Sequence, residues 1–227
     1  MATIRKVLKK GLLIAFEGID GAGKTTQAKV LRNYLSNLGY DVIVTKEPTE
    51  SSYGKKIKKL SHNRELSPEQ ECELFIADRK EHIKSVIGPS IKEKKIVIAD
   101  RYYFSTIAYQ GALGLDIGKI KKENESFAPI PDIVFLLIVT PKIGLLRIRK
   151  NRNEIPNVFE QEEYLAKVQK IFRNLTELYI IEVPAHGIIE SVSEIIKNVV
   201  DDIIRYYSNN YARLYTFDRK IKVFKQT

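Results

Sequence analysis

The chain has 227 residues, 44% of them hydrophobic, which predicts one globular α/β domain or two small ones and argues against a disordered protein. Its 38 Lys and Arg residues outnumber 28 Asp and Glu, and the net charge of +10 favours anionic partners without separating nucleotides from polynucleotides. A single cysteine and three histidines argue against a disulfide framework and against a zinc site built from Cys or His.

Short apolar runs alternate along the chain with longer amphipathic stretches, which is typical of βα units around a mainly parallel sheet. The predicted strands are Leu12–Phe16, Val42–Thr45, Ile96–Ala99, Ile133–Val139 and Ile180–Val183. The predicted helices are Lys24–Leu38, Pro68–Glu93, Tyr103–Gly111, Pro141–Lys150, Glu160–Tyr179 and Glu190–Tyr207, the second of them broken at Gly88-Pro89. No repeat or linker interrupts this order, so we expect a single domain over 1–227.

The sequence contains no run that predicts a membrane segment. The first apolar run ends at Glu17 and is shorter than the roughly 7–15 apolar residues of a signal peptide core. No stretch approaches the roughly 18 apolar residues of a membrane span. We therefore expect a soluble, cytoplasmic protein.

The residues between the first strand and the first helix fit the P-loop pattern of a glycine, four residues and then Gly-Lys-Ser/Thr. Glycines let several backbone N–H groups surround a phosphate, and the helix that follows directs its positive end at the same charge. Lys24 would contact the β- and γ-phosphates of ATP, and the Thr25 hydroxyl would bind Mg²⁺. The predicted ATP-binding residues are Gly18, Ile19, Asp20, Gly21, Ala22, Gly23, Lys24, Thr25 and Thr26.

A second strand end also carries charged residues, because Asp100 and Arg101 follow Ile96–Ala99 directly. Ligands of open α/β sheets bind beyond the carboxyl ends of the strands, so we expect Asp100 beside the P-loop, holding Mg²⁺ or its water. Arg101 would then supply a cation where donor and acceptor phosphates repel each other. The chain lacks the Asn-Lys-x-Asp motif of GTPases, and an arginine stands where ATPase motors usually carry a second acid. These features favour a kinase whose acceptor is an anion. They also favour a catalytic role for Asp100 and Arg101 over a simple surface ion pair.

Several spaced motifs in one order resemble the thymidylate kinase family of P-loop nucleoside monophosphate kinases. The resemblance runs from about Leu12 to Tyr179 and rests on Phe16-Glu17-Gly18, Gly23-Lys24-Thr25-Thr26-Gln27, Lys46-Glu47-Pro48-Thr49, Leu74-Phe75-Ile76-Ala77-Asp78-Arg79, Asp100-Arg101-Tyr102, Ser105, Ala108-Tyr109-Gln110, Pro131-Asp132 and Phe159-Glu160. It implies a five-stranded parallel sheet flanked by helices, a homodimer, and Mg²⁺-dependent transfer of the ATP γ-phosphoryl group to dTMP.

The resemblance also implies roles for single residues. Asp20 resembles the acid that contacts the sugar 3′-hydroxyl, and Arg101 resembles the clamp on the acceptor phosphate. Phe75 looks like the ring that stacks on thymine, and Arg79, one helical turn later, resembles the residue that contacts a thymine carbonyl. Tyr109 looks like the residue that crowds the 2′ position and disfavours ribonucleotides. Taken alone, Phe75 and Tyr109 would be core side chains, and only their order relative to the other motifs favours the pocket. The further predicted substrate-binding residues are Glu47, Pro48, Thr106 and Gln110.

A basic run, Arg147–Arg152, and the polar segment after it resemble the family's mobile lid, over about residues 149–158. In the subclass with glycine after the P-loop acid, which Gly21 matches, the lid supplies the catalytic arginine. We therefore predict that Arg149 or Arg152 closes over the transferring phosphoryl group and excludes water. The alternative for these arginines is a solvated helix end.

Other positions depart from the family pattern. Lys46 replaces an arginine, which keeps the charge and loses the bidentate fork, and Ile138 lies where an acid is usual. Asn151 replaces a common lid arginine, and Val158 replaces a basic residue. These departures bear on the lid and on base specificity more than on the reaction.

Two other functions stay open at this point. One is a kinase for another nucleotide or for a nucleoside. The other is a P-loop ATPase that binds nucleic acid through Lys55–Lys59 and through the basic, aromatic tail 208–227, which is more simply a terminal element packed on the body. We favour the dTMP kinase and expect no nucleic-acid partner, because the motifs occur together and in order.

Overall fold

The computed structural model describes residues 6–62, 65–151 and 158–209. Its five strands are parallel and form one sheet in the order β2-β3-β1-β4-β5. They are β1 (Leu12–Glu17), β2 (Val42–Lys46), β3 (Ile96–Asp100), β4 (Ile133–Ile138) and β5 (Ile180–Pro184). All the predicted strands are confirmed, with ends that differ by no more than a residue. Strands β1 and β3 are buried throughout because helices cover both faces of the sheet, which explains their uninterrupted apolar sequences.

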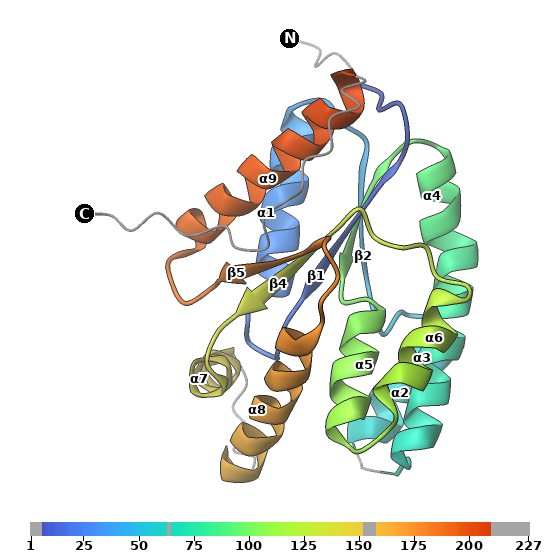
Figure 1. Ribbon diagram of the computed structural model, residues 1–227, viewed down its shortest axis with the longest axis vertical. Helices are drawn as coiled ribbons and strands as arrows, with labels where there is room; N and C mark the ends of the chain where they lie inside the picture. Colours follow the sequence, from blue (N-terminus) through green and yellow to red (C-terminus); the bar gives the residue numbers. More distant parts are fainter. Residues whose placement is uncertain (1–5, 63–64, 152–157, 210–227) are drawn as a thin grey trace.

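Helices cover the two faces of this sheet (Figure 1). They are α1 (Lys24–Asn37), α2 (Ser52–His62), α3 (Pro68–His82), α4 (Gly88–Lys92), α5 (Tyr103–Ala112), α6 (Ile117–Glu125), α7 (Pro141–Asn151), α8 (Val158–Asn174) and α9 (Ile189–Asn209). Helices α1 and α9 pack side by side on one face, while α3, α5 and α8 lie on the other. None of the helices within the described residues is long and apolar enough to cross a membrane.

The predicted break at Gly88-Pro89 is wrong, because the chain stays helical through this pair. A π-helical turn, η1 (Ile83–Ile87), joins α3 to α4, and the Gly88 N–H donates to the Ile83 carbonyl five residues earlier. The wider turn accommodates a proline that has no N–H and whose ring would clash with the carbonyl of a regular helix.

Other boundaries follow local signals. The start of α3 is a capping box, in which Ser67 Oγ accepts from the Gln70 N–H and Gln70 Oε1 accepts from the Ser67 N–H. Gly39, with φ of 92°, follows α1 in the left-handed conformation that ends many helices. The predicted helix Glu160–Tyr179 is too long, since α8 ends at Asn174.

The register of the central strands places charged residues together at one edge of the sheet. Phe16 on β1 pairs with Asp100 on β3, so Glu17, the last residue of β1, and Arg101, the first residue after β3, lie side by side at the end of the sheet. The P-loop also begins here, between β1 and α1. The carboxyl edge of the sheet is therefore where a ligand site of this fold is expected.

Candidate active site

The loop between β1 and α1 depends on its glycines, most clearly on Gly18 and Gly21. Gly18 and Gly21 have φ values of 132° and 76°, which L side chains rarely adopt. A Cβ on Gly18 would lie 2.5 Å from the Leu137 carbonyl oxygen, and one on Gly21 would lie 2.1 Å from the Gly144 carbonyl oxygen. The backbone therefore curves tightly against β4 and α7, as a phosphate-binding loop must.

Lys24 folds back into this loop. Its Nζ donates to the carbonyl oxygens of Gly18 and Ile19, both at 2.8 Å, and the residue is only 6% exposed. Burial lowers the pKa of Lys24 to about 7, and the nearby charge of Arg101 acts in the same direction. A phosphate in the loop would replace two neutral carbonyl acceptors with an anion and favour the charged amine.

Thr25 and Asp100 together offer oxygen atoms that suit a magnesium ion. The Thr25 hydroxyl donates to Asp100 Oδ2 at 2.5 Å, and Lys46 Nζ lies 3.8 Å from the same oxygen. The other carboxylate oxygen, Asp100 Oδ1, is buried and has no hydrogen-bond partner within the described part of the chain. Mg²⁺ binds a carboxylate, a hydroxyl and phosphate oxygens, so these residues fit the predicted metal.

Arg101 lies where the phosphate loop meets a neighbouring cavity. Its φ of 76° is unusual for a residue other than glycine, and such strained backbone gathers at functional sites. Its guanidinium donates to Asp20 Oδ1 at 2.5 Å and to Ser105 Oγ at 3.0 Å. Tyr109 donates its hydroxyl to the other oxygen of Asp20 at 3.2 Å. The predicted acceptor-site residues Asp20, Arg101 and Tyr109 thus form one connected group.

Glu17 is buried next to Arg101 and bonds to the residues that follow it, Tyr102 and Ser105. The carboxylate is fully buried and accepts the backbone N–H groups of Tyr102 and Ser105, at 2.8 and 3.1 Å, and the Ser105 hydroxyl at 2.5 Å. Ser105 in turn accepts from Arg101, so Glu17 fixes the arginine through a shared neighbour. Sequence reasoning noted Glu17 only within a family motif and gave it no role.

We expect Glu17 to make the stability of the fold depend on pH. Burial raises the pKa of Glu17 from its ordinary value of 4.5 to about 7, so between these values the folded protein holds a proton that the unfolded chain has lost. Its contribution to stability is present below pH 4.5 and is lost as pH rises through about 7. Relative to Glu17→Gln, the free energy of unfolding of the wild type should fall by on the order of 1–3 kcal/mol between pH 5 and pH 8.

Urea unfolding of both proteins at the two pH values measures this difference. Subtracting the free energy of unfolding of Glu17→Gln from that of the wild type removes the contribution of groups that titrate alike in both proteins. A gap between wild type and variant that stays constant with pH would show that Glu17 does not titrate abnormally.

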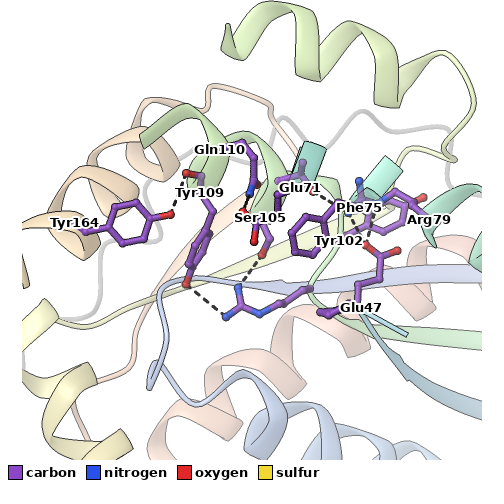
Figure 2. Close-up of a pocket in the computed structure, with 12 residues that line it drawn as sticks. Glu47, Glu71, Phe75, Arg79, Tyr102, Ser105, Tyr109, Gln110 and Tyr164 are labelled. Atoms are coloured by element: carbon purple, nitrogen blue, oxygen red, sulfur yellow. Dashed lines mark hydrogen bonds and ion pairs between the residues drawn. The ribbon is translucent and has the colours of Figure 1, made fainter. Parts of the chain in front are cut away.

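A cavity of about 240 Å³ opens beside Arg101 (Figure 2). It is lined by Glu47, Pro48, Glu71, Phe75, Arg79, Arg101, Tyr102, Ser105, Thr106, Tyr109, Gln110 and Tyr164. The predicted substrate residues are all in this lining except Asp20, which reaches the cavity through its bonds to Arg101 and Tyr109. Phe75 is half-buried on the cavity wall and is not part of the core, so the core alternative is wrong for this ring.

Arg79 is the most tightly held side chain of the cavity. It is 1% exposed, and its Nε and Nη2 both donate to Glu47 Oε2, at 2.8 and 2.5 Å. Further bonds run from Nη2 to Thr106 Oγ1 at 3.0 Å and from Nη1 to Asn124 Oδ1 at 2.6 Å. Glu47 and Thr106 therefore hold Arg79 in place as well as lining the cavity.

The predicted lid is only partly within the described residues. Arg149 is exposed near the end of α7, and Arg152 with most of 149–158 lies outside the described residues. Arg147, which begins the lid-like basic run but was not predicted to be catalytic, donates to the Ala185 carbonyl at 2.9 Å and to the Gly21 carbonyl at 3.4 Å. It ties α7 to the phosphate loop.

Sequence reasoning also missed cavity residues that helix geometry could have found. Glu71 lies four residues before Phe75 and eight before Arg79, so all three face the same side of α3. Tyr164 on α8 and Asn124 on α6 gave no such signal, because they reach the site only through the packing of distant helices.

Comparison with known proteins agrees with this geometry. The family model described as thymidylate kinase matches residues 16–196. The chain is 47% identical to a thymidylate kinase of Desulfotalea psychrophila over 86% of its own length and 96% of that protein. It is 40% identical to a thymidylate kinase of Brachyspira hyodysenteriae, over 85% of this chain and 95% of the relative. The chain, in which a phosphate loop, the pair Asp100-Arg101 and a cavity lie together at one edge of the sheet, belongs to the thymidylate kinase family.

Proposed function

We propose that the protein transfers the γ-phosphoryl group of ATP to dTMP, giving dTDP and ADP. The observation that carries this proposal is the position of Arg101, whose side chain borders both the P-loop acid Asp20 and the cavity. Two bound nucleotides would meet there with their phosphates facing each other. A nucleoside kinase or a nucleic-acid-binding ATPase would not need a second phosphate site at Arg101.

The reaction needs positioning and charge neutralisation more than a covalent intermediate. An oxygen of the dTMP phosphate would attack the γ-phosphorus directly, and the bond to the β-phosphate oxygen would break. Arg101 would hold the attacking phosphate, while Lys24 would leave the carbonyls of Gly18 and Ile19 to neutralise the donor. Cations placed before the reaction lower the barrier because charge spreads over the transferring group.

Mg²⁺ supplies further neutralisation of the ATP phosphates when it is bound. Thr25 and Asp100 would hold it, since Asp100 Oδ1 is a buried acceptor without a partner in the described ranges. The Thr25 hydroxyl donates its hydrogen to Asp100 and keeps lone pairs on its oxygen, so it could bind the ion without giving up that hydrogen bond.

The cavity would take the nucleoside of dTMP. Phe75 offers a flat apolar face for the base, Arg79 a donor for a thymine carbonyl, and Asp20 an acceptor for the 3′-hydroxyl. Tyr109 would crowd the 2′ position, and Arg149 or Arg152 would close over the phosphates. The homodimer stays a prediction from the family resemblance. The cytoplasmic location and the single domain over 1–227 stay predictions from the sequence.

An acceptor panel tests the proposed function. ADP release is measured with ATP and either dTMP, dUMP, dCMP, UMP or thymidine. We expect the highest kcat/KM with dTMP and little turnover of thymidine, which lacks the phosphate that Arg101 binds. Higher kcat/KM with UMP or thymidine than with dTMP would contradict it.

A further inference from the structure

The amide of Gln110, on the wall of the cavity, is held in one orientation. Gln110 is 2% exposed and lines the cavity, and its Nε2 donates to Glu71 Oε2 at 2.7 Å. Figure 2 shows the two side chains together, one from α5 and one from α3. The other amide atom, Gln110 Oε1, is buried and has no partner among the residues that the structure describes.

The carboxylate decides which way this amide lies. An ionised carboxylate only accepts hydrogen bonds, so a rotation of the amide by half a turn would put two oxygens in contact at 2.7 Å. Glu71 therefore keeps the NH₂ group of Gln110 on its own side. What Gln110 offers to a ligand is an acceptor, and a buried acceptor without a partner is costly until a donor binds it.

Arg79, which also lines the cavity, supplies the complementary group. A guanidinium has five N–H donors, and the bonds to Glu47, Thr106 and Asn124 account for four of them. Both residues line the cavity, and a donor on Arg79 with an acceptor on Gln110 would suit two adjacent groups of a thymine or uracil ring, the O4 carbonyl and the N3–H. Cytosine carries an amino group and an unprotonated nitrogen at these places, so both bonds would be lost.

We infer that Glu71 is a positioning residue that sets the base preference of the pocket by orienting Gln110. The inference rests on the proposed function, in which this cavity holds the base, and it adds the residue that selects a base with N3–H. Glu71 itself need not touch the nucleotide. Its effect is a difference in affinity between two kinds of base. One donates a hydrogen bond to Gln110 Oε1, and the other places a second acceptor against that oxygen.

Glu71→Gln tests the inference, because a neutral amide of the same shape can either accept from Gln110 or donate to it. Both orientations of Gln110 then become accessible. We expect the KM for dTMP to rise about tenfold and the inhibition constant of dCMP against dTMP to stay constant or fall. The kcat and the KM for ATP should change by less than about twofold, which a general loss of structure would not permit. Glu73→Gln, on an exposed position of the same helix, is the matched control.

A double-mutant cycle separates this role from general packing. If Glu71 acts through Gln110, then Glu71→Gln should leave the ratio of dTMP to dCMP affinity unchanged in a Gln110→Ala background. An unchanged ratio in the Glu71→Gln single variant, or an equal effect in both backgrounds, would overturn the inference. Wild-type turnover of dTMP in the same assay reports separately on the proposed function.

Discussion

Lys24→Ala should lower kcat by on the order of 10²–10³-fold with both substrates saturating. The ammonium group is the cation of the phosphate loop, and only its charged form neutralises the γ-phosphoryl group as charge spreads in the transition state. ADP release measured at saturating ATP and dTMP gives the effect. A kcat within tenfold of the wild-type value would show that Lys24 does not have the catalytic role assigned to it.

The same substitution should not destabilise the fold. Lys24 is buried in a site that lowers the pKa of its amine to about 7, so its charge opposes folding when no phosphate is present. We expect the Tm of Lys24→Ala to equal or exceed that of the wild type without nucleotide. Lys29→Ala, on an exposed position one turn later in α1, is the matched control and should keep full activity.

Arg101→Ala should lower kcat/KM for dTMP by about 10³-fold, with a smaller effect on the KM for ATP. The arginine is anchored by Asp20 and Ser105, so its guanidinium is held in place before the acceptor phosphate arrives. Without the guanidinium, the positive charge that reduces the repulsion between the phosphates of ATP and dTMP is lost. Steady-state kinetics with each substrate varied in turn separate the two KM values.

Thymidine provides the internal check for Arg101. Because thymidine has no phosphate, its affinity for Arg101→Ala should stay within about twofold of the wild-type value, measured by calorimetry. A parallel loss of thymidine and dTMP binding would mean that the substitution damages the base pocket instead. Arg32→Ala, on an exposed position of α1, controls for the loss of a positive charge.

Local patterns were sufficient to predict the sheet and the phosphate loop. Strands β1 and β3 are buried on both faces, so each appears as an apolar run, and the loop has a spacing that phosphate geometry imposes. The capping box at Ser67 is also a short-range signal, because it depends on Ser67 and on Gln70 three residues later. By contrast, α2 and α6 were missed, because their lysine-rich sequences have no apolar stripe long enough to stand out.

The connections within the site could not be read from the sequence. Asn124 bonds to Arg79 across a separation of 45 residues, and Glu17 bonds to Ser105 across 88. Such pairs depend on how the helices pack against the sheet, which no local pattern specifies. The π-helical turn before Pro89 is a similar case, since proline in a helix normally predicts a break.

The most direct test of the account is the affinity of one molecule in which adenosine and thymidine are joined by five phosphates. If the P-loop and Arg101 bring two nucleotides together, this molecule occupies both sites at once, and calorimetry should show binding at least about 10²-fold tighter than ATP. Lys24→Ala and Arg101→Ala should each remove most of that gain. Binding no tighter than that of ATP, or unaffected by Arg101→Ala, would contradict a shared phosphate-transfer site.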